Sequence, residues 1–523
     1  MIAEFSRPLT RYSNTSVYSV RTLQFLNSVM TTASSLQFVP SSLDNVEQIE
    51  NYRTGGFHPV SIGESFSRGR YRVLHKLGFG GFSTVWLARD EQSHRLVSLK
   101  IMTAEASKTC DEMRILQYLK DSAICHPACD HILCVLDHFT IDGPNGSHSC
   151  LVSPFAGPSL AQMAYSPGQP AGTRRLRGAL ARKFAKQVTG IVGYLHSRGV
   201  AHGDLTSSNI LIQLAHVDSW SDHDVYERLG FPVTAKVRAC SGELNDKPCA
   251  PDYLVESANL SNLEYKWFTE RVLLVDFGQS FFLQTSSSDN VAITVSYFAP
   301  EVFFEEKASN LSDIWALGCT IFEIRAGFQL FESFFDDPDD VIRQMVQTLG
   351  KLPEPWWSSW ERRNDFFDED GKPKKYWPND IPLSKEYPLI QLIRDIGADD
   401  YQLVADEVAV ETDNMKSSDG TEPETKSMFE PMGKRLSATE VEVFEDLLHK
   451  VLRYNPEQRL QIQEIINHSW FTIPSESSST VMDPISTTAP SHTKRGKSDR
   501  IANGNEKVQT SECCCFPSER PCF

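Results

Sequence analysis

Three glycines in one short turn narrow the possible folds of this chain more than any other part of its sequence. Gly78, Gly80 and Gly81 lie within residues 71–88, where apolar and polar residues alternate on both sides of the turn. Such alternation predicts a β-hairpin. Because glycine has no Cβ, the backbone N–H groups of the turn can come close to a phosphate chain. A strand and not a helix follows the glycines, which argues against a dinucleotide-binding fold. An ordinary hairpin with a glycine turn remains the alternative.

A single lysine interrupts the apolar strand that follows the hairpin. Lys100 lies between Leu99 and Ile101, and such a lysine either solubilises an edge strand or is a buried cation held by a carboxylate and phosphate oxygens. The helical segment 108–120 offers Glu112 as the carboxylate. A Lys100–Glu112 ion pair would offset the burial of the lysine and direct its ammonium at nucleotide phosphates. Taken alone, Glu112 would be a solvated helix residue.

Two polar motifs follow a predicted amphipathic helix at residues 181–197. In the first, Asp204 can accept the proton of an attacking hydroxyl, and Asn209, five residues later, can hold a metal ion through its amide oxygen. In the second, Asp276 follows an apolar strand and precedes a Phe-Gly pair, where its carboxylate can bridge magnesium to phosphates. The spacing from Asp204 to Asn209 is the diagnostic part, whereas an isolated Asp-Phe-Gly often occurs by chance. The order of the two motifs after the glycine turn, the lysine and the glutamate is very unlikely to be accidental.

This ordered set resembles that of the eukaryotic protein kinases, from residue 71 to residue 471. Residues 298–301 match the kinase Ala-Pro-Glu signature, and residues 312–318 match the helix start Asp-x-Trp-x-x-Gly. The resemblance implies an α+β, bilobal fold with a small β-rich N-lobe and a larger helical C-lobe. It also implies a buried Glu301–Arg459 ion pair that holds the activation segment against the C-lobe, with a strong loss of stability if one partner is removed.

Within this family, the closest resemblance is to the SR-protein kinases of the CMGC group. Residues 50–63 resemble the segment before the first strand in that subfamily, and residues 346–353 resemble the entry to the CMGC insert. A long insertion before Asp-Phe-Gly is also typical, and 67 positions separate Asn209 from Asp276. The resemblance implies a serine/threonine kinase that transfers the γ-phosphate of ATP to serine in Arg/Ser-rich proteins, most simply splicing factors.

The resemblance assigns a role to each candidate site residue. Asp204 is the catalytic base, Asn209 and Asp276 bind Mg²⁺, and Lys100, oriented by Glu112, contacts the ATP phosphates. Contacts to ATP are predicted at Leu77, Gly78, Phe79, Gly80, Gly81, Phe82, Ser83, Thr84, Val85, Lys100 and Ala156. Val85 is placed to cover the adenine ring.

Four residues depart from the kinase pattern. Gly203 replaces the arginine before the catalytic aspartate, as in SR-protein kinases, which implies activity without phosphorylation of the activation loop. Thr206 stands where a lysine usually steadies the γ-phosphate, which could lower the rate. Phe298 replaces an arginine of the CMGC activation segment, and Ser153 is unusually small for its place before Ala156. We therefore keep a catalytically weak scaffold as a second hypothesis.

A third hypothesis is a small-molecule phosphotransferase, because residues 202–204 resemble the catalytic loop of aminoglycoside kinases. The activation-segment anchor formed by Glu301 and Arg459 counts against it, since that group lacks such an anchor.

Charge and composition limit the partners. The net charge of −17, from 51 basic and 68 acidic side chains, excludes a protein that binds nucleic acid mainly by neutralising phosphates. No apolar run reaches the roughly 18 residues that span a bilayer, so we expect no transmembrane segment. Twelve cysteines without framework spacing indicate a reduced setting. We expect a monomer in the cytoplasm, the nucleus or both, without direct nucleic-acid binding, that acts on basic Arg/Ser-rich proteins.

Polycationic substrates favour an enzyme with carboxylates near its cleft. The candidates are Glu332, Asp336, Asp337, Asp339 and Asp340. A solvated acidic loop that only aids solubility is the alternative.

The flanking segments are less informative. The predicted leader, residues 1–49, is poor in acidic residues and rich in Ser and Thr, as in a disordered leader or a transit peptide. The two insertions should be surface loops, and the second carries ten carboxylates and one lysine between residues 395 and 424. Cys513, Cys514 and Cys515 could be S-acylated. The predicted parts are a leader (1–49), an extension (50–70), a kinase domain (71–471; N-lobe 71–156, C-lobe 157–471, insertions 213–270 and 395–430) and a disordered tail (472–523).

Overall fold

The structure is a computed structural model of the 523-residue chain, and it describes the protein between residues 36 and 474 with several gaps. Three predictions fall outside the described residues: those on the leader up to residue 35, on most of the acidic insertion, and on the tail with its three cysteines. The described residues are 36–109, 111–121, 126–165, 172–245, 247–284, 294–333, 336–376, 381–382, 384–398 and 428–474.

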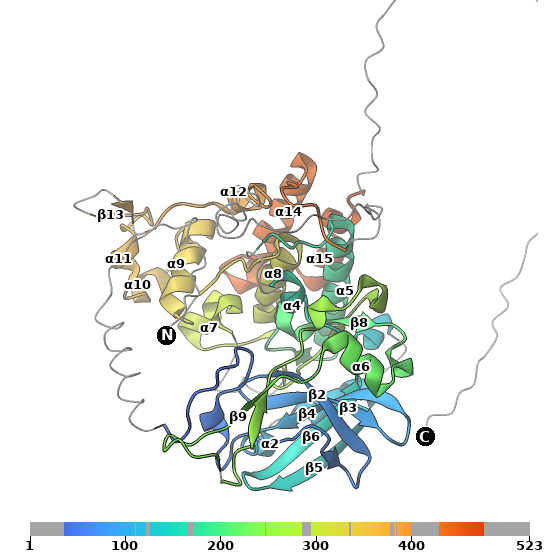
Figure 1. The fold of residues 1–523 in the computed structure, drawn as a ribbon. Coiled ribbons are helices and arrows are strands. Elements are labelled where there is room, and N and C mark those ends of the chain that lie inside the picture. Colours follow the sequence, from blue (N-terminus) through green and yellow to red (C-terminus); the bar gives the residue numbers. More distant parts are fainter. Residues whose placement is uncertain are drawn as a thin grey trace, which may run out of the picture. The chain divides into compact units, whose positions relative to one another are not determined.

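An antiparallel sheet of six strands forms the predicted N-lobe (Figure 1). The strands are β1 (Ser65–Phe66), β2 (Tyr71–Phe79), β3 (Ser83–Asp90), β4 (Arg95–Met102), β5 (Asp137–Gly143) and β6 (Gly146–Pro154). Their order in the sheet is β1-β2-β3-β4-β6-β5. The predicted hairpin is present, because β2 pairs with β3 and Gly78 faces Val85 across the pair. The glycine-rich turn therefore lies at one end of the two strands.

Helices make up most of the predicted C-lobe. They are α4 (Leu160–Ala164), α5 (Gly178–Ser197), α7 (Pro300–Glu305), α8 (Asn310–Ala326), α9 (Pro338–Leu349), α10 (Trp356–Ser359), α11 (Arg363–Phe366), α12 (Leu389–Arg394), α14 (Ala438–Val451) and α15 (Ile462–Ile466). Residues 313–326 of α8 are all buried, and α8 shares one apolar core with α5 and α14. The α+β, bilobal prediction is confirmed. No helix in the described ranges is both long and apolar enough to cross a membrane.

Two short helices and four short strand pairs complete the framework around the site. The predicted helix at 108–120 is divided into α2 (Ala106–Thr109) and α3 (Glu112–Asp121). The paired strands are β7 (Val200–Ala201) with β12 (Phe281–Phe282), β8 (Ile210–Leu214) with β11 (Phe268–Leu274), β9 (Thr234–Lys236) with β10 (Tyr253–Val255), and β13 (Lys375–Tyr376) with β14 (Ile381–Pro382). The β8–β11 pair matters most, because Asn209 directly precedes β8 and Asp276 closely follows β11.

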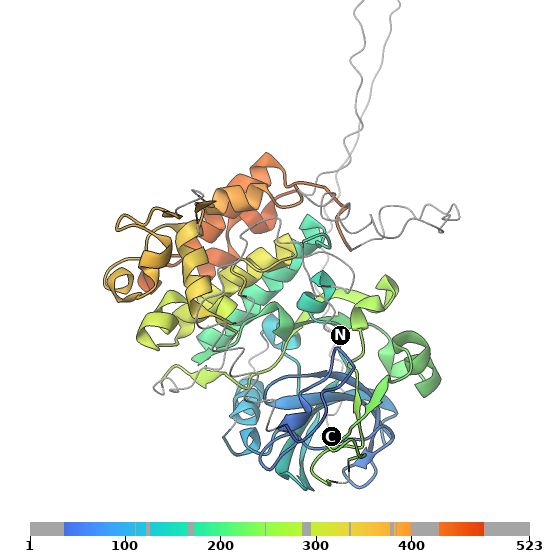
Figure 2. The same ribbon diagram turned by 60° about the vertical axis from the view of Figure 1, so that its left-hand side comes forward.

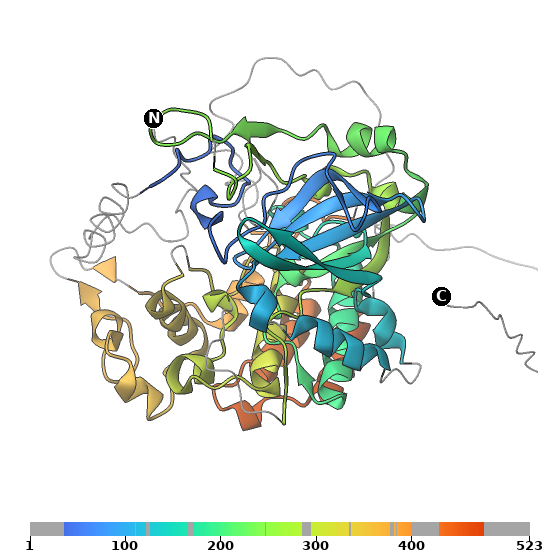
Figure 3. The same ribbon diagram turned by 90° about the horizontal axis from the view of Figure 1, so that it is seen from below.

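Residues 213–270, called the insertion below, do not form the predicted surface loop. They contain helix α6 (Asp222–Leu229) and the β9–β10 pair, and they lie beside the blue sheet in Figure 3. Trp220 and Val225 are buried in a cluster that includes Leu74 and Leu87 of the sheet. The prediction was wrong because it rested on the overall polar composition, with its Gly, Pro and Asp residues, although the sequence contains a short apolar run at residues 253–255 and the four-residue spacing of Val225 and Leu229 in α6.

The described end of the predicted leader is also packed. Phe38 and Ile49 are buried together with Val237 and Leu254 of the insertion, and Figure 2 shows the dark blue segment beside the green one. The leader boundary predicted at residue 49 is therefore wrong for the described part, which belongs to the folded N-lobe. Isolated apolar residues in a Ser/Thr-rich segment did not reveal this contact.

Candidate active site

The glycine-rich turn is open on the side where a ligand would approach. Gly80 N–H donates a hydrogen bond to the Ser83 carbonyl at 2.9 Å, which closes the turn. A Cβ added at Gly78, Gly80 or Gly81 would meet nothing within 4 Å. These glycines are therefore not required by the packing of the protein itself, which leaves room for a phosphate chain against the backbone.

The other predicted nucleotide contacts lie on two faces of the sheet. Val85 is directly opposite Lys100 in the β3–β4 ladder, so their side chains share one face. Thr84 lies on the other face, where its hydroxyl accepts a hydrogen bond from Trp86 Nε1 at 3.0 Å. A nucleotide on the Lys100 face could contact Thr84 only through its backbone. Among the other predicted contacts, Ser83 and Ala156 are buried, Leu77 is partly buried, and Phe79 and Phe82 are exposed.

Lys100 forms the ion pair that the sequence predicted. Its Nζ lies 2.9 Å and 2.7 Å from the two carboxylate oxygens of Glu112 and 2.8 Å from Asp276 Oδ1. Burial opposes the charge on Lys100, but these two carboxylates prevail and raise its pKa. The lysine is a cation at neutral pH, fixed where the sheet meets the strand that leads to Asp276.

The Asp-Phe-Gly segment is held against the same glutamate. Phe277 N–H donates to Glu112 Oε1 at 3.1 Å, and Asp276 adopts a φ of +62°, which non-glycine residues seldom do. Strained backbone of this kind is frequent at functional sites. Burial works against ionisation of Asp276, but the Lys100 ammonium keeps its pKa below the ordinary value. Asp276 is therefore a carboxylate at neutral pH.

Asp204 and Asn209 lie together in the catalytic loop. The Asn209 amide Nδ2 donates to the Asp204 carbonyl and to Asp204 Oδ2, both at 2.9 Å. The second carboxylate oxygen, Oδ1, is buried without a hydrogen-bond partner among the described residues. Burial, aided by the nearby charge of Asp276, raises the pKa of Asp204 to about 7. One carboxylate oxygen is thus fixed by Asn209, and none of the described side chains donates to the other.

Asp313 in α8 anchors the catalytic loop, a role that its place in the helix signature did not reveal. Its carboxylate accepts hydrogen bonds from the backbone N–H of His202 at 2.7 Å and of Gly203 at 3.0 Å, and it lies 3.0 Å from His196 Nε2. Asp313 is buried, and although burial opposes ionisation, the histidine contact keeps its pKa below the ordinary value. The backbone before Asp204 is therefore held by charge-assisted hydrogen bonds.

The packing explains why a glycine stands at position 203. Gly203 has a φ of +80°, and a Cβ at this position would lie 2.2 Å from the Gln279 carbonyl oxygen. The next residue of that segment, Ser280, donates its hydroxyl hydrogen to the His202 carbonyl at 2.7 Å. The beginning of the activation segment thus rests directly on the catalytic loop, in a space that an arginine side chain would need.

The remaining departures from the kinase pattern lie near the site. Thr206 is buried, whereas the lysine that it replaces would need to reach the γ-phosphate. Phe298 packs against Phe303 with ring centroids 5.2 Å apart. Ser153 is partly exposed and pairs with Ser98 between β4 and β6.

The predicted Glu301–Arg459 ion pair is confirmed. Arg459 Nη1 and Nη2 each lie 2.7 Å from a carboxylate oxygen of Glu301, and both side chains are buried. Nη1 also donates to the Leu311 carbonyl at 2.7 Å. The pair joins α7, which contains Glu301, to the segment before α15, which contains Arg459.

A second buried carboxylate beneath the site, Glu323 of α8, was not identified from the sequence. Tyr297 donates its hydroxyl hydrogen to Glu323, and Ser207 of the catalytic loop lies 3.4 Å from the Tyr297 hydroxyl. Burial raises the pKa of Glu323 to about 7. A glutamate inside an apolar helix was the available signal, since such residues are rarely buried without a partner.

Comparison with known proteins identifies the family. The family described as protein kinase domain matches residues 71–226 and 260–471. Protein kinase dsk1 of Schizosaccharomyces pombe is 27% identical over 430 residues, covering 65% of this chain and 78% of that protein. Serine/threonine-protein kinase SRPK of Physarum polycephalum is 28% identical over 347 residues, covering 63% and 78%. SRSF protein kinase 3 of Homo sapiens is 35% identical over 170 residues, covering 32% and 29%. The chain therefore belongs to the protein kinase family, as a serine/threonine kinase that resembles the SR-protein kinases.

Proposed function

We propose that this kinase transfers the γ-phosphate of ATP to serine in basic, Arg/Ser-rich proteins, among them splicing factors. Two of the similar proteins carry the names SRPK and SRSF protein kinase 3. The net charge of −17 is compatible with a basic substrate. The observation that carries the proposal is the charge of the segment that leads into α9.

That segment keeps a negative surplus after its internal ion pairs are counted. Asp340 pairs with Arg343, and Arg362 lies 3.5 Å from Asp339 and 3.8 Å from Asp337. Arg362 also lies 3.1 Å from Asp365, so the two arginines are shared among four carboxylates and the segment stays acidic. Glu332 and Asp336 of this segment are exposed. A polycation can be attracted to this surface, although less strongly than the sequence alone suggested.

The residues of the site support phosphoryl transfer to a hydroxyl. Asp204 Oδ1 is the available acceptor for the proton of an incoming serine, since Oδ2 is occupied by Asn209. Lys100 is placed to contact the phosphates of ATP in the position that Glu112 fixes. Closing lobes around these groups would exclude water from the transferred phosphoryl group.

The same residues fit a magnesium ion. Asp276 supplies a carboxylate, and Asn209 directs its amide nitrogen to Asp204, which leaves its amide oxygen for a cation. Mg²⁺ is commonly held by one or two protein oxygens together with substrate phosphates. When bound, the ion would neutralise charge on the phosphates of ATP. We therefore assign Asn209 and Asp276 as its protein ligands.

A peptide panel tests the proposed substrate. Full-length protein is incubated with ATP, Mg²⁺ and an Arg-Ser repeat, a Ser-Pro or an acidic-context peptide, with Asp204→Asn as the inactive control. We expect the Arg-Ser peptide to have the highest kcat/KM, and Glu332→Gln with Asp336→Asn to raise its KM without changing the KM for ATP. Equal use of all three peptides contradicts the proposed substrate, and no incorporation above the control favours the scaffold hypothesis. A monomeric state, a cytoplasmic or nuclear location and a lack of nucleic-acid binding stay predictions.

A further inference from the structure

The insertion connects the two halves of the active site along a route separate from the covalent link at the end of β6. The insertion begins at the end of β8, which follows Asn209, and it ends in β11, which precedes Asp276. Between these strands α6 lies against the N-lobe sheet. The match to the protein kinase domain stops at residue 226 and resumes at residue 260, so the contacting residues Trp220, Asp222 and Val225 lie at the edge of the matched range. None of them is among the catalytic residues assigned above.

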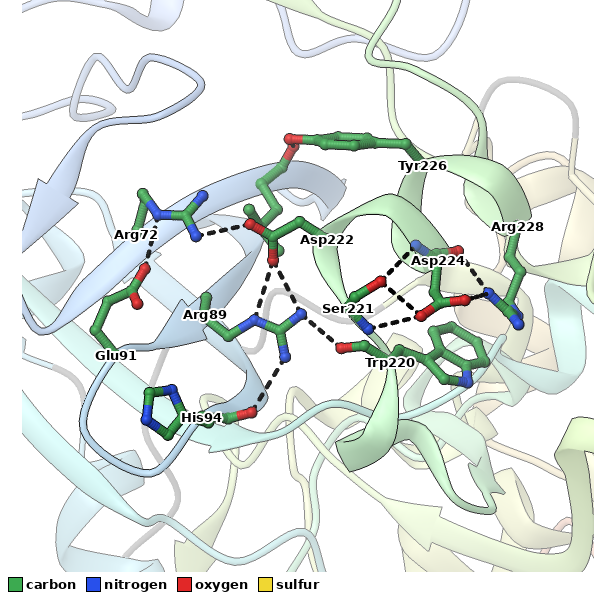
Figure 4. Close-up of polar contacts among 11 residues, drawn as sticks. Arg72, Arg89, Glu91, His94, Trp220, Ser221, Asp222, Asp224, Tyr226 and Arg228 are labelled. Carbon is green, nitrogen blue, oxygen red and sulfur yellow. Dashed lines mark hydrogen bonds and ion pairs between the residues drawn. The ribbon is translucent and has the colours of Figure 1, made fainter.

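One carboxylate at the start of α6 joins both strands of the glycine-rich hairpin (Figure 4). Asp222 Oδ2 accepts a hydrogen bond from Arg72 Nη2 of β2 at 2.7 Å. Asp222 Oδ1 accepts from Arg89 of β3, at 3.1 Å from Nε and 2.9 Å from Nη2. Burial opposes ionisation of Asp222, but the hydrogen bonds from Arg72 and Arg89 prevail and lower its pKa. The helix thus supplies one anion to two cations.

The position of the two arginines explains why the sheet needs this anion. Arg72 and Arg89 are direct partners in the β2–β3 ladder, and like charges at such positions repel each other. Arg89 is buried, and its other hydrogen bonds go to the carbonyls of Trp220 and His94, at 2.7 Å and 3.2 Å. Glu91 pairs with Arg72 alone. Asp222 is therefore the single carboxylate among the described ion pairs that bridges both arginines.

An apolar contact beside this ion cluster extends to the predicted adenine site. Trp220 and Val225 pack with Leu74, Leu87 and Leu96 of the sheet and with Phe155 at the end of β6, and Leu77 is packed against the same cluster. By the strand register, Arg89 and Leu87 share the face of Val85 and Lys100. The insertion thus touches the sheet on the face that would receive the nucleotide.

We propose that Asp222 is a positioning residue for ATP binding: through Arg72 and Arg89 it ties the hairpin that carries the glycine-rich turn to the strands that carry Asn209 and Asp276. The hairpin then spends most of its time where its turn can cover a phosphate chain. Apparent affinity falls in proportion to the population of the binding-competent position. Loss of Asp222 should therefore weaken nucleotide binding before it affects the transfer step.

Asp224, two residues further along the same helix, provides a matched control. Its carboxylate accepts hydrogen bonds from Ser221 N–H at 2.8 Å and from Arg228 Nη1 at 2.7 Å, all within the insertion (Figure 4). Asp224→Asn removes a charge and weakens the start of α6 without touching the sheet. A purely structural role of α6 would make Asp222→Asn and Asp224→Asn behave alike.

The test is direct nucleotide binding by full-length protein, without any protein substrate, so that it does not depend on the Arg/Ser assignment. Calorimetric titration with Mg²⁺ and a non-hydrolysable ATP analogue should give a Kd about tenfold higher for Asp222→Asn than for wild type, and within about twofold of wild type for Asp224→Asn. Amide hydrogen exchange should increase across β2 and β3 in the Asp222 variant alone. In turnover assays the KM for ATP should rise while kcat changes by less than about twofold.

Further variants keep the proposal testable if Asp222→Asn folds poorly. Arg72→Gln removes the half-exposed partner and should raise the Kd in the same direction, and the double variant Arg72→Gln/Asp222→Asn should be less than additive. Equal nucleotide affinities in the Asp222 and Asp224 variants overturn the proposal. Equal losses of kcat and thermal stability in both variants, with an unchanged KM for ATP, also overturn it.

Discussion

The catalytic loop and the glycine-rich hairpin face the same cleft, but different kinds of contact hold them. In the loop, the backbone N–H groups of His202 and Gly203 donate hydrogen bonds to the buried Asp313 carboxylate at 2.7 Å and 3.0 Å. The hairpin is held through side chains, by an Asp222 carboxylate whose side chain is 34% exposed. Backbone bonds to a buried anion resist fluctuation, whereas half-exposed ion pairs exchange with water and are screened by salt.

This difference separates what the two regions should control. Changes in the support of the catalytic loop should reduce stability and turnover together, because its buried charges cannot find other partners. Changes in the support of the hairpin should reduce nucleotide affinity and leave the helical lobe intact. The variants below change buried groups in and around the catalytic loop, and the Asp222 and Asp224 variants test the support of the hairpin.

The largest effect is expected at Asp204. Asp204→Asn keeps the shape of the side chain but removes the proton acceptor, so we expect kcat to fall by roughly 10²–10⁴-fold. Nucleotide affinity should stay within about threefold, because Asp204 bonds to Asn209 and not to the hairpin. Phosphate incorporation and calorimetric titration measure the two quantities. Activity within tenfold of wild type would show that another group accepts the proton.

The next largest effect is expected at the buried Glu301–Arg459 pair. Glu301→Gln leaves the Arg459 guanidinium buried with too little counter-charge, which should lower the free energy of unfolding by about 3–5 kcal/mol. The exposed Lys183–Glu270 pair is the control, with side chains 51% and 66% exposed. Glu270→Gln should cost at most about 1 kcal/mol. Urea unfolding curves of equal midpoint for the two variants would contradict this ranking.

The catalytic loop could be predicted from the sequence, and the support of the hairpin could not. Asp204, Asn209 and Asp276 stand at fixed spacings in short motifs, and Lys100 with Glu112 breaks an apolar pattern in a way that demands a partner. Such signals are local. Asp222 meets Arg72 across 150 residues, and no periodicity or spacing links an aspartate in a polar insertion to two arginines on a strand pair.

The same reasoning explains the errors on the flanking segments. Glu47 forms a buried ion pair with Lys76 beneath the hairpin, and Tyr52 donates its hydroxyl hydrogen to Glu47. The Ser/Thr-rich composition around Glu47 is that of a leader. Only the fold reveals that Glu47 offsets the charge of a buried lysine. The composition of a segment predicts how exposed its residues are on average. It does not predict a single contact, such as the one between Glu47 and Lys76, that packs the segment against the sheet.

A pH effect of intermediate size is expected from Glu323. Its folded pKa of about 7 lies above the ordinary 4.5, so the folded protein keeps a proton that the unfolded chain loses. The contribution of Glu323 to stability should therefore be fully present below about pH 4.5 and be lost as pH rises to about 7, a loss of at most about 3 kcal/mol. Tyr297, Ser207 and Glu332 are the other groups that act on it.

Glu323→Gln provides the readout for this effect, because glutamine imitates the protonated acid. Urea unfolding at pH 5 and pH 8 should show the variant gaining stability relative to wild type at the higher pH. Parallel pH profiles for the two proteins would mean that Glu323 does not titrate in this range.

The smallest effect compares two glycines in the same backbone region. Gly199 has a φ of +70° with nothing within 4 Å of an added Cβ, whereas a Cβ at Gly203 would lie 2.2 Å from the Gln279 carbonyl oxygen. Gly199→Ala should cost about 1 kcal/mol of stability from backbone strain alone. Gly203→Ala should cost about 1–2 kcal/mol more, because the Gln279 backbone must move. It should also lower kcat, since the activation segment rests on the loop that carries Asp204. If both variants lose the same stability and keep full activity, the close contact at Gly203 does not hold the activation segment against the catalytic loop.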